Sequence, residues 1–222
     1  MKVKNNEIKL IIFDLDGTLL DSCKIWKEVD INFFKKRNLL MPSTYSQDIS
    51  HMGLTAASKY TKETFNLKES PEEIIKEWED AVLEKYKNEV KLKPYAREFL
   101  EQCKRNGIIL SVATANQENC YLPCLKRNDV LSYFEKIIDV RNYPQGKDNP
   151  DIYLQISKEF NLDPKNILVI EDISKAINSA NKGGFNTCAI FEETSLEEEN
   201  KKQASDIYIL SFKDLLEIAN EK

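Results

Sequence analysis

An uninterrupted apolar run near the N-terminus leads directly into two acids and a glycine. The segment is residues 10–18, LIIFDLDGT. The apolar part has the length of a strand and is too short for a core helix, so it predicts a strand buried on both faces. Ligands of open α/β sheets bind outside the carboxyl ends of the strands. We therefore expect Asp14, at the end of this strand, to lie in a functional site.

Residues 21–92 show helical periodicity and no convincing strand. Apolar positions recur at helical spacing up to about residue 37, with Asp21 or Ser22 as the expected cap, and a second helix is expected near 55–65. The tetrapeptide SPEE at 70–73 is a capping box with proline at the first helical position. The segment is therefore expected to be an all-helical domain.

From residue 93 onward, strand and helix patterns alternate. A helix is expected to start at Pro94 and to end at Gly107 with a glycine cap. The strands expected after it are residues 108–113, 136–140, 167–170, 187–191 and 207–210, and the helices are 117–127, 151–160, 174–182 and 212–220. This alternation predicts parallel βαβ units with right-handed crossovers. The predicted fold is α/β, with a Rossmann-like parallel sheet in residues 1–20 and 93–222 and the helical domain inserted as residues 21–92.

The composition narrows the possible partners and the compartment. The chain has 222 residues, 41% hydrophobic and 31% charged, with a net charge of −5. The acidic balance argues against nucleic acid, and no apolar run approaches a membrane span. The N-terminus lacks the features of a signal peptide. We expect a cytoplasmic protein, monomeric, with no nucleic-acid or membrane partner.

Cysteine and histidine are too few for several common kinds of site. The five cysteines contain no Cys-x-x-Cys pair, and His51 is the single histidine. A Cys/His zinc site therefore has few candidate ligands, and a Ser-His-Asp triad is disfavoured. We expect reduced structural thiols. His51 is expected in a loop, with a substrate contact left open.

Complementary polar groups follow four of the predicted strands or their loops. They are Asp14 and Asp16, Thr114, Lys147, and the pair Glu171 and Asp172. Several acids, one ammonium and one hydroxyl at a single sheet edge would repel one another unless a charged ligand lay among them. A divalent cation together with a phosphate balances that set, and oxygen ligands without histidine favour Mg²⁺.

This arrangement resembles the haloacid dehalogenase superfamily, in its phosphatase and phosphomutase branch. Asp14 to Thr18 is similar to the family's first motif, Thr114 to the second, Lys147 to the third, and Glu171-Asp172 to the fourth. The helical insertion falls where the family places its cap domain. The resemblance covers nearly the whole chain.

The resemblance implies a role for each motif residue. Asp14 would be the nucleophile that forms an aspartyl-phosphate, and Asp16 the general acid and then base. Thr114 would donate its hydroxyl to a phosphoryl oxygen, and Lys147 would neutralise the transferring group. Backbone N–H groups of Leu15, Asp16 and Ala115 would complete the phosphate site.

The resemblance also implies a magnesium site. The carboxylates of Asp14 and Asp172 and the carbonyl of Asp16 would be ligands. Glu171 would act through water or orient the ligands. Taken singly, Thr114 has the alternative of a helix cap and Lys147 that of a surface lysine.

Three further residues are candidate substrate contacts. Trp26 and Asp30 lie one turn apart on the first inserted helix, and Asn116 follows the second strand of the core. The alternatives are a core aromatic for Trp26, a surface ion pair for Asp30 and a helix cap for Asn116. β-Phosphoglucomutases usually have a histidine twelve residues after the nucleophile, where this chain has Trp26, so a phosphatase is favoured over a mutase.

The function expected from the sequence is a Mg²⁺-dependent phosphatase of a small phosphorylated metabolite, acting through an aspartyl-phosphate. A phosphomutase of the β-phosphoglucomutase type is the first alternative. A non-catalytic phospho-acceptor or binding protein is the second. The identity of the substrate is not contained in the motifs, because cap residues determine it.

Overall fold

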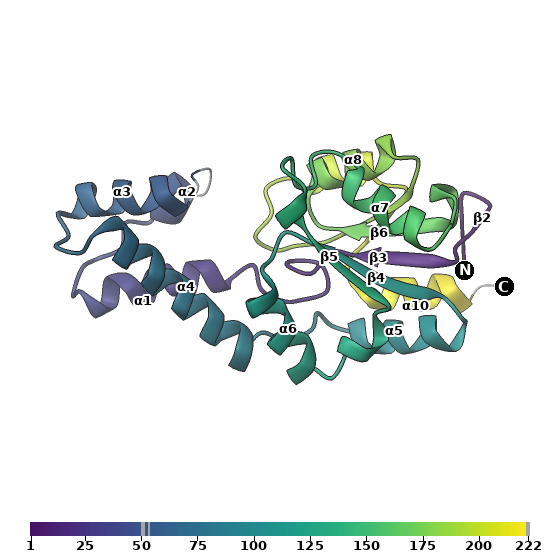
Figure 1. The fold of residues 1–222 in the computed structure, drawn as a ribbon, viewed down its shortest axis with the longest axis horizontal. Coiled ribbons are helices and arrows are strands. Elements are labelled where there is room, and N and C mark those ends of the chain that lie inside the picture. The colour runs from purple at the N-terminus through teal and green to yellow at the C-terminus, as the bar shows by residue number, and fades with distance from the viewer. Residues whose placement is uncertain (50–51, 53, 221–222) are drawn as a thin grey trace. The chain divides into compact units, whose positions relative to one another are not determined.

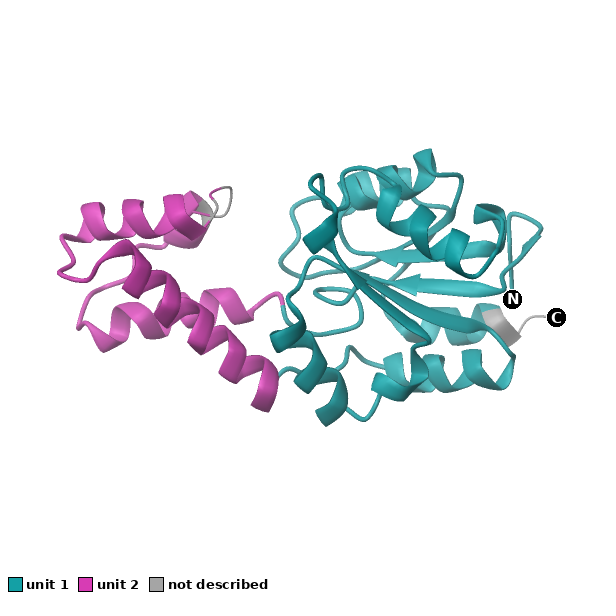
Figure 2. Cartoon of the chain, in the orientation of Figure 1, with its two compact units in different colours: residues 1–22, 90–222 teal, residues 23–89 magenta. Residues whose placement is uncertain are grey.

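The computed structural model describes residues 1–49, 52 and 54–220. His51 lies outside the described residues, so its predicted loop position and substrate contact stay predictions. The chain divides into two compact units, residues 1–22 with 90–222 and residues 23–89 (Figure 2).

Unit 1 is built on a six-stranded sheet whose strands are all parallel. The strands are β3 (Leu10–Phe13), β4 (Ile109–Thr114), β5 (Lys136–Asp139), β6 (Ile167–Glu171), β7 (Asn186–Ile190) and β8 (Ile207–Ile209). Their order across the sheet is β5-β4-β3-β6-β7-β8, so the chain winds in one direction from β3 to β5 and in the other from β6 to β8. This is the doubly wound arrangement, which has its ligand crevice where the order reverses. The predicted α/β class is confirmed.

Helices cover both faces of the sheet (Figure 1). One layer contains α5 (Ala96–Arg105) and α10 (Phe212–Asn220), and the other contains α7 (Asp151–Glu159) and α8 (Ser174–Lys182). Alternate side chains of β3 enter the two layers. Phe13 stacks edge-on against Phe99 of α5, with ring centroids 6.2 Å apart. Ile12 packs in the opposite core with Ile152 of α7. The remaining helices of unit 1 are α6 (Glu118–Arg127) and α9 (Glu198–Ala204).

Unit 2 is helical throughout its described elements. These are α1 (Ile25–Lys36), α2 (Tyr45–Ile49), α3 (Leu54–Phe65) and α4 (Pro71–Asn88). The predicted capping box at the start of α4 is confirmed: the Glu73 N–H donates to Ser70 Oγ at 3.2 Å, and the Ser70 N–H donates to Glu73 Oε2 at 2.7 Å. Aromatic rings fill the interior, with Phe34 edge-on to both Tyr45 and Phe65 at 4.7 Å.

Two predicted helix starts are wrong. The helix expected from Pro94 begins at Ala96, because Tyr95 has a left-handed backbone with φ of 62°. The first helix of unit 2 begins at Ile25 and has no side-chain cap, because the hydroxyl of Ser22 bonds to Asp16 instead. The predicted glycine cap of α5 is confirmed: Gly107 has φ of 69°, and the Ile108 N–H donates to the Cys103 carbonyl at 3.0 Å.

Several short elements have no counterpart in the sequence prediction. They are the hairpin strands β1 (Lys2–Val3) and β2 (Asn6–Glu7), helices α2 and α9, and the 3₁₀ turns η1 (Leu131–Tyr133), η2 (Val140–Asn142) and η3 (Pro164–Asn166). Two-residue strands and single turns are too short to produce a periodic pattern. The seven-residue helix α9 has one buried side chain, Lys201, so it has no apolar stripe.

The two connections between the units run side by side within unit 1. Leu20 forms an antiparallel bridge with Leu92, and the Asp21 N–H donates to the Lys91 carbonyl at 2.9 Å. Residues 21, 22 and 90–92 belong to unit 1, whereas the predicted inserted domain, residues 21–92, includes them.

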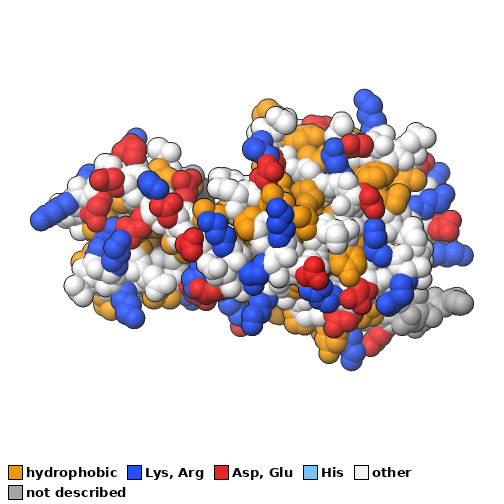
Figure 3. Space-filling model, turned by 60° about the horizontal axis from the view of Figure 1, so that its bottom comes forward, with side chains coloured by type: hydrophobic (Ala, Val, Ile, Leu, Met, Phe, Trp, Pro, Cys, Tyr) orange, Lys and Arg blue, Asp and Glu red, His pale blue; other side chains and the backbone are white. Residues whose placement is uncertain are grey.

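The surface mixes charges of both signs, as the face in Figure 3 shows. All five cysteines are free thiols, and four of them are buried. Among the described helices, none is long and apolar enough to cross a membrane.

Candidate active site

The parallel register brings the polar ends of three strands to one level. Phe13, the last residue of β3, pairs with Val112 of β4 and with Ile170 of β6. The next residue, Asp14, donates its N–H to the Ile170 carbonyl at 3.0 Å. Asp14 therefore lies beside Glu171, at the point where the strand order reverses.

A tight turn follows Asp14 and directs the chain away from the sheet. Gly17 has φ of 78°, a conformation that glycine adopts without strain. Its N–H donates to the Leu20 carbonyl at 3.0 Å, and the Leu20 N–H donates back to the Leu15 carbonyl at 2.7 Å. The Asp-Gly-Thr sequence thus forms a turn, and this turn fixes the backbone position of Asp16.

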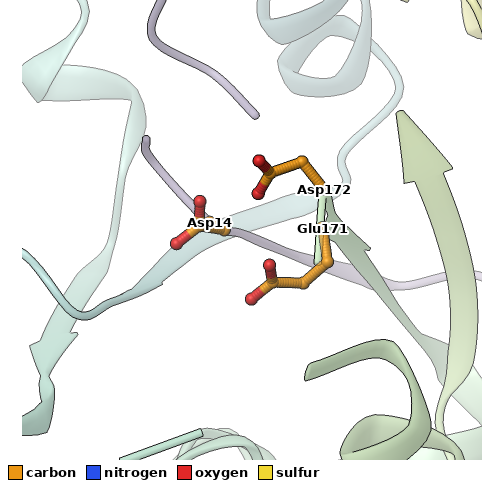
Figure 4. A group of neighbouring side chains, drawn as sticks. All are labelled: Asp14, Glu171 and Asp172. Carbon is orange, nitrogen blue, oxygen red and sulfur yellow. The ribbon is translucent and has the colours of Figure 1, made fainter. Parts of the chain in front are cut away.

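Three carboxylates converge at this edge (Figure 4). One oxygen from each of Asp14, Glu171 and Asp172 lies within 4.8 Å of the other two. All three residues are buried, with exposures of 7%, 1% and 6%. Buried carboxylates at such spacing repel each other strongly unless cations lie among them.

Lys147 supplies one of the cations. Its ammonium donates to a carboxylate oxygen of Asp14 and, at 2.6 Å, to Glu171 Oε1. The Tyr153 hydroxyl donates to the same Glu171 oxygen at 2.9 Å. The side chain of Lys147 is 11% exposed, so the alternative of a solvated surface lysine is wrong.

The pKa directions show that the negative charge is undercompensated. Burial raises the pKa of Glu171 to about 7 despite the opposing effect of Lys147. Burial, followed by the charges of Asp14 and Glu171, raises the pKa of Asp172 well above its usual value. Burial by itself would lower the pKa of Lys147. The negative charges of Asp14 and Glu171 outweigh the effect of burial, so the pKa of Lys147 is raised. With all three acids ionised, the group and Lys147 would carry a net charge of −2, and the raised pKa values of Glu171 and Asp172 reflect the cost of that charge.

This donor set fits a divalent cation. The ligand atoms are carboxylate oxygens alone, as Mg²⁺ prefers, and an ion of charge +2 matches the unbalanced charge. Thr18 is an additional residue here, since its hydroxyl donates to Asp172 Oδ1 at 3.2 Å and orients that carboxylate.

Asp16 is held by two side chains that the sequence analysis did not connect with it. Ser22 Oγ donates to Asp16 Oδ1 at 2.7 Å, and Asn116 Nδ2 donates to Asp16 Oδ2 at 2.8 Å. Asn116 does not cap α6, whose cap residue is Gln117 and makes no side-chain cap bond. Its substrate contact stays a prediction.

The second motif lies at the end of β4. Thr114 is fully buried, and its Oγ1 accepts the Asn116 N–H at 3.0 Å, as a local turn would require. Leu15 is buried and Ala115 is exposed. Their roles in phosphate binding stay predictions.

Trp26 and Asp30, the candidate substrate contacts in unit 2, do not match their structural alternatives. Trp26 is 44% exposed, so it is not a core aromatic. Asp30 is 5% exposed and accepts a hydrogen bond from Ser46 Oγ at 2.8 Å, so it is not a surface ion pair. Burial raises the pKa of Asp30 to about 6, although the bond from Ser46 opposes this.

Sequence reasoning missed Thr18, Ser22 and Tyr153 as partners of the acids. Thr18 belongs to the first motif and could have been found by asking which hydroxyl follows the turn. Ser22 and Tyr153 gave no local signal, because a cap serine and an apolar-stripe tyrosine have ordinary structural explanations.

Comparison with models of known protein families gives one match over most of the chain. The model described as haloacid dehalogenase-like hydrolase matches residues 11–190. The chain belongs to the haloacid dehalogenase-like hydrolase family. The predicted family and the predicted hydrolase class are thereby confirmed, and the matched range contains all the motif residues from Asp14 to Asp172.

Individual relatives are distant in sequence and similar in fold. The chain is 26% identical to the phosphorylated carbohydrates phosphatase of Thermotoga maritima over 80% of its length and 82% of the relative's. It is 24% identical to hexitol phosphatase B of Escherichia coli K12, over 75% and 76%. A solved structure named "putative beta-phosphoglucomutase" from Thermotoga maritima is 22% identical, with a TM-score of 0.86 over 96% of this chain and 99% of that one. The last likeness concerns the fold alone.

Proposed function

We propose that the protein is a Mg²⁺-dependent phosphatase that hydrolyses a small phosphorylated metabolite through an aspartyl-phosphate on Asp14. The observation that supports this most is the placement of Asp14, buried at the strand-order reversal and paired with Lys147, beside two further acids. An isolated carboxylate is a weak nucleophile for a phosphate dianion, because like charges repel. The cations around Asp14 reduce that repulsion.

The first half of the reaction transfers the phosphoryl group to Asp14. A carboxylate oxygen of Asp14 attacks phosphorus, and the bond from phosphorus to the leaving oxygen breaks. Asp16 gives its proton to the leaving oxygen, which departs as an alcohol. Lys147, the Thr114 hydroxyl and the backbone N–H groups of Leu15 and Ala115 hold the phosphoryl oxygens in this proposal.

The second half restores the enzyme. The Asp16 carboxylate takes a proton from a water molecule, whose oxygen attacks the same phosphorus. The bond to Asp14 breaks, inorganic phosphate leaves, and Asp16 is again protonated. The bonds from Ser22 and Asn116 hold the Asp16 carboxylate in one orientation, as a proton carrier used twice requires.

The metal in this proposal is held by Asp14, Asp172 and the carbonyl of Asp16, with Glu171 acting through water or through Lys147. Bound there, Mg²⁺ would withdraw negative charge from the phosphoryl oxygens. Glu171 and Thr18 are almost fully buried, so the proposed metal site has little exposure on their side.

Sugar and polyol phosphates are the first substrates to test. Two relatives are named for phosphorylated carbohydrates and for hexitol phosphates. The helical unit 2 is the proposed cap domain that selects the leaving group, and Trp26 and Asp30 are its predicted substrate contacts. Trp26 has no ring nitrogen that accepts a proton, so it cannot replace the histidine expected of a mutase.

A phosphate-release screen tests the proposal. Purified protein is given sugar phosphates, polyol phosphates, nucleotides and phosphoglycolate, with Mg²⁺ and with a chelator. Release of phosphate from at least one ester, in Mg²⁺ only, is the expected result. Conversion of β-glucose 1-phosphate to its isomer in the presence of a trace of bisphosphate would establish the mutase instead. A long-lived acyl phosphate without release would establish the phospho-acceptor.

A further inference from the structure

A buried tyrosine lies behind the catalytic lysine, and no step above uses it. The hydroxyl of Tyr153, on α7, donates to Glu171 Oε1 at 2.9 Å. The same oxygen accepts the ammonium of Lys147 at 2.6 Å, and that ammonium also donates to Asp14. A hydrogen-bonded chain thus runs from helix α7 through Glu171 and Lys147 to the proposed nucleophile.

The tyrosine ring has little freedom to move. Tyr153 is 1% exposed, and its ring lies edge-on to Phe185 with centroids 6.0 Å apart. The ring also belongs to the apolar core formed by β3, β6 and α7. The hydroxyl is therefore presented at one point relative to the sheet that carries Asp14.

Glu171 needs such a fixed donor. Its side chain has rotatable bonds, and it lies among charges that attract it in different directions: Lys147, and any cation shared with Asp14 and Asp172. A carboxylate that turned toward the cation would leave Lys147 with Asp14 as its remaining acid partner. The hydroxyl of Tyr153 opposes that rotation, because its bond to Oε1 would break.

We propose that Tyr153 is a positioning residue that fixes Glu171, so that the Lys147 ammonium is held at Asp14 in the geometry used for phosphoryl transfer. The inference rests on the proposed function for its effect on turnover. It rests on the geometry alone for its effect on the lysine. Tyr153 touches neither the substrate nor the reacting atoms in this proposal.

Tyr153→Phe removes the hydroxyl and keeps the ring, so packing is preserved. Loss of a hydrogen bond to a charged group is expected to lower kcat about tenfold. The KM for substrate should stay within about twofold, because Lys147 is still present to bind phosphate. The matched control is Tyr121→Phe. Tyr121 is another buried tyrosine of unit 1, and its hydroxyl makes no hydrogen bond to the residues that the structure describes. It should leave both constants unchanged.

A double-mutant cycle separates this role from a general structural one. If Tyr153 acts through Glu171, then Tyr153→Phe has no further effect on kcat once Glu171→Ala has removed the acceptor. The same tenfold loss in both backgrounds would mean that Tyr153 acts independently of Glu171, and the proposal would be wrong. An unchanged kcat in the single variant, or a rise in KM alone, would also overturn it.

A second measurement does not require activity. In metal-free protein with ¹⁵N-labelled lysine, the Lys147 ammonium signal is assigned by its loss in Lys147→Met. Tyr153→Phe should shift or broaden this signal. Lys201 serves as an internal reference, because its ammonium is fully buried and donates to the Ile190 carbonyl at 3.1 Å and to Glu198 at 2.5 Å. Its signal should not move.

The two measurements have distinguishable failures. If no phosphate ester is hydrolysed, the proposed function fails, and the lysine signal alone decides whether Tyr153 positions Lys147. If the enzyme is active and the Lys147 signal of Tyr153→Phe coincides with that of the wild type, the proposed function stands and the role of Tyr153 is refuted.

Discussion

The two units differ in where their charged side chains lie. Unit 2 packs aromatic rings inside and has ion pairs on its surface, as with Lys76, whose ammonium lies 2.8 Å from Asp80 Oδ2. Unit 1 buries Asp14, Glu171 and Asp172 together at one sheet edge, against a single ammonium. The first arrangement is what stability alone favours.

This difference indicates that the buried acids of unit 1 lower the stability of the fold and belong to a functional site. Buried charges that are incompletely paired destabilise a fold, and burial raises the pKa of an acid so that its neutral form is favoured. Perturbed acids grouped in this way are characteristic of functional sites. In unit 2, Asp30 behaves like Glu171 and Asp172 of unit 1, because it is buried and its pKa is raised to about 6. The following predictions test the contrast.

Asp14→Asn should have the largest effect. Turnover is expected to fall at least about 1000-fold, because the amide cannot accept the phosphoryl group. The melting temperature should stay level or rise, since one of three crowded negative charges is removed. Turnover and thermal melting are measured on the same preparation, with Asp151→Asn, at an exposed position in α7, as control. Retained turnover would refute Asp14 as nucleophile.

Thr114→Val keeps the shape of the side chain and removes its hydroxyl. The expected result is a loss of about 100-fold in kcat/KM, as for other donors to a developing negative charge. Ser111→Ala on the same strand is the matched control, because the Ser111 hydroxyl is buried without a hydrogen-bond partner. That control should leave kcat/KM unchanged. Equal effects of the two substitutions would mean that Thr114 has no specific role.

Metal binding should stabilise unit 1 through Asp172. At a Mg²⁺ concentration 100 times its Kd, the gain in free energy of unfolding is about 2.7 kcal/mol. Asp172→Asn is expected to lose most of this gain, because a neutral amide is a poorer ligand. Thermal melting is followed with Mg²⁺ and with NaCl of equal ionic strength. A melting temperature that rises equally in both proteins would exclude Asp172 as a ligand.

The smallest effect is expected in unit 2, from Asp30. Its pKa is raised from 3.8 to about 6 by burial, so the folded state binds the proton more tightly than the unfolded state. The contribution to stability is therefore present at low pH and is lost as pH rises through this range. Between pH 5 and pH 7 it amounts to about 1 kcal/mol.

Asp30→Asn should remove this dependence on pH. Urea unfolding at several pH values measures it, with the exposed Asp80→Asn of the same unit as control. If the variant and the wild type lose the same stability between pH 5 and pH 7, another group is responsible.

The main elements of the fold were predictable because their signals are local. Apolar runs mark the strands, the SPEE box marks the start of α4, and Gly107 marks the end of α5. The start of α5 was not predictable, because a tyrosine at position 95 does not indicate a left-handed backbone conformation. Propensity favours such a conformation in glycine and asparagine, and here the tertiary structure imposes it on tyrosine.

The acids of the candidate site and Lys147 were predictable from the sequence, whereas their partners Thr18, Ser22 and Tyr153 and the contacts among them were not. Asp14 and Asp172 directly follow β3 and β6, as the alternation of elements predicts, whereas Lys147 lies in the loop before α7 and reaches Asp14 and Glu171 from there. The bond from Asn116 to Asp16 joins residues 100 positions apart, and periodicity contains no information about such a pair. The burial of Asp30 was not predictable, because charged residues are seldom buried and the alternative to a substrate contact was a surface ion pair.

The strand order has a consequence for how the chain folds. β3 is the first strand of the six-stranded sheet to be made, yet Leu10 has its neighbours at Ile109 on one side and Ile167 on the other. During synthesis this apolar strand has no partner in the sheet until β4 is made, and Ile109 of β4 lies 99 residues after Leu10, whereas unit 2 needs only nearby contacts to form. We infer that unit 1 folds late, after β6 has been made, and that a chain whose translation stops before β6 has no active site.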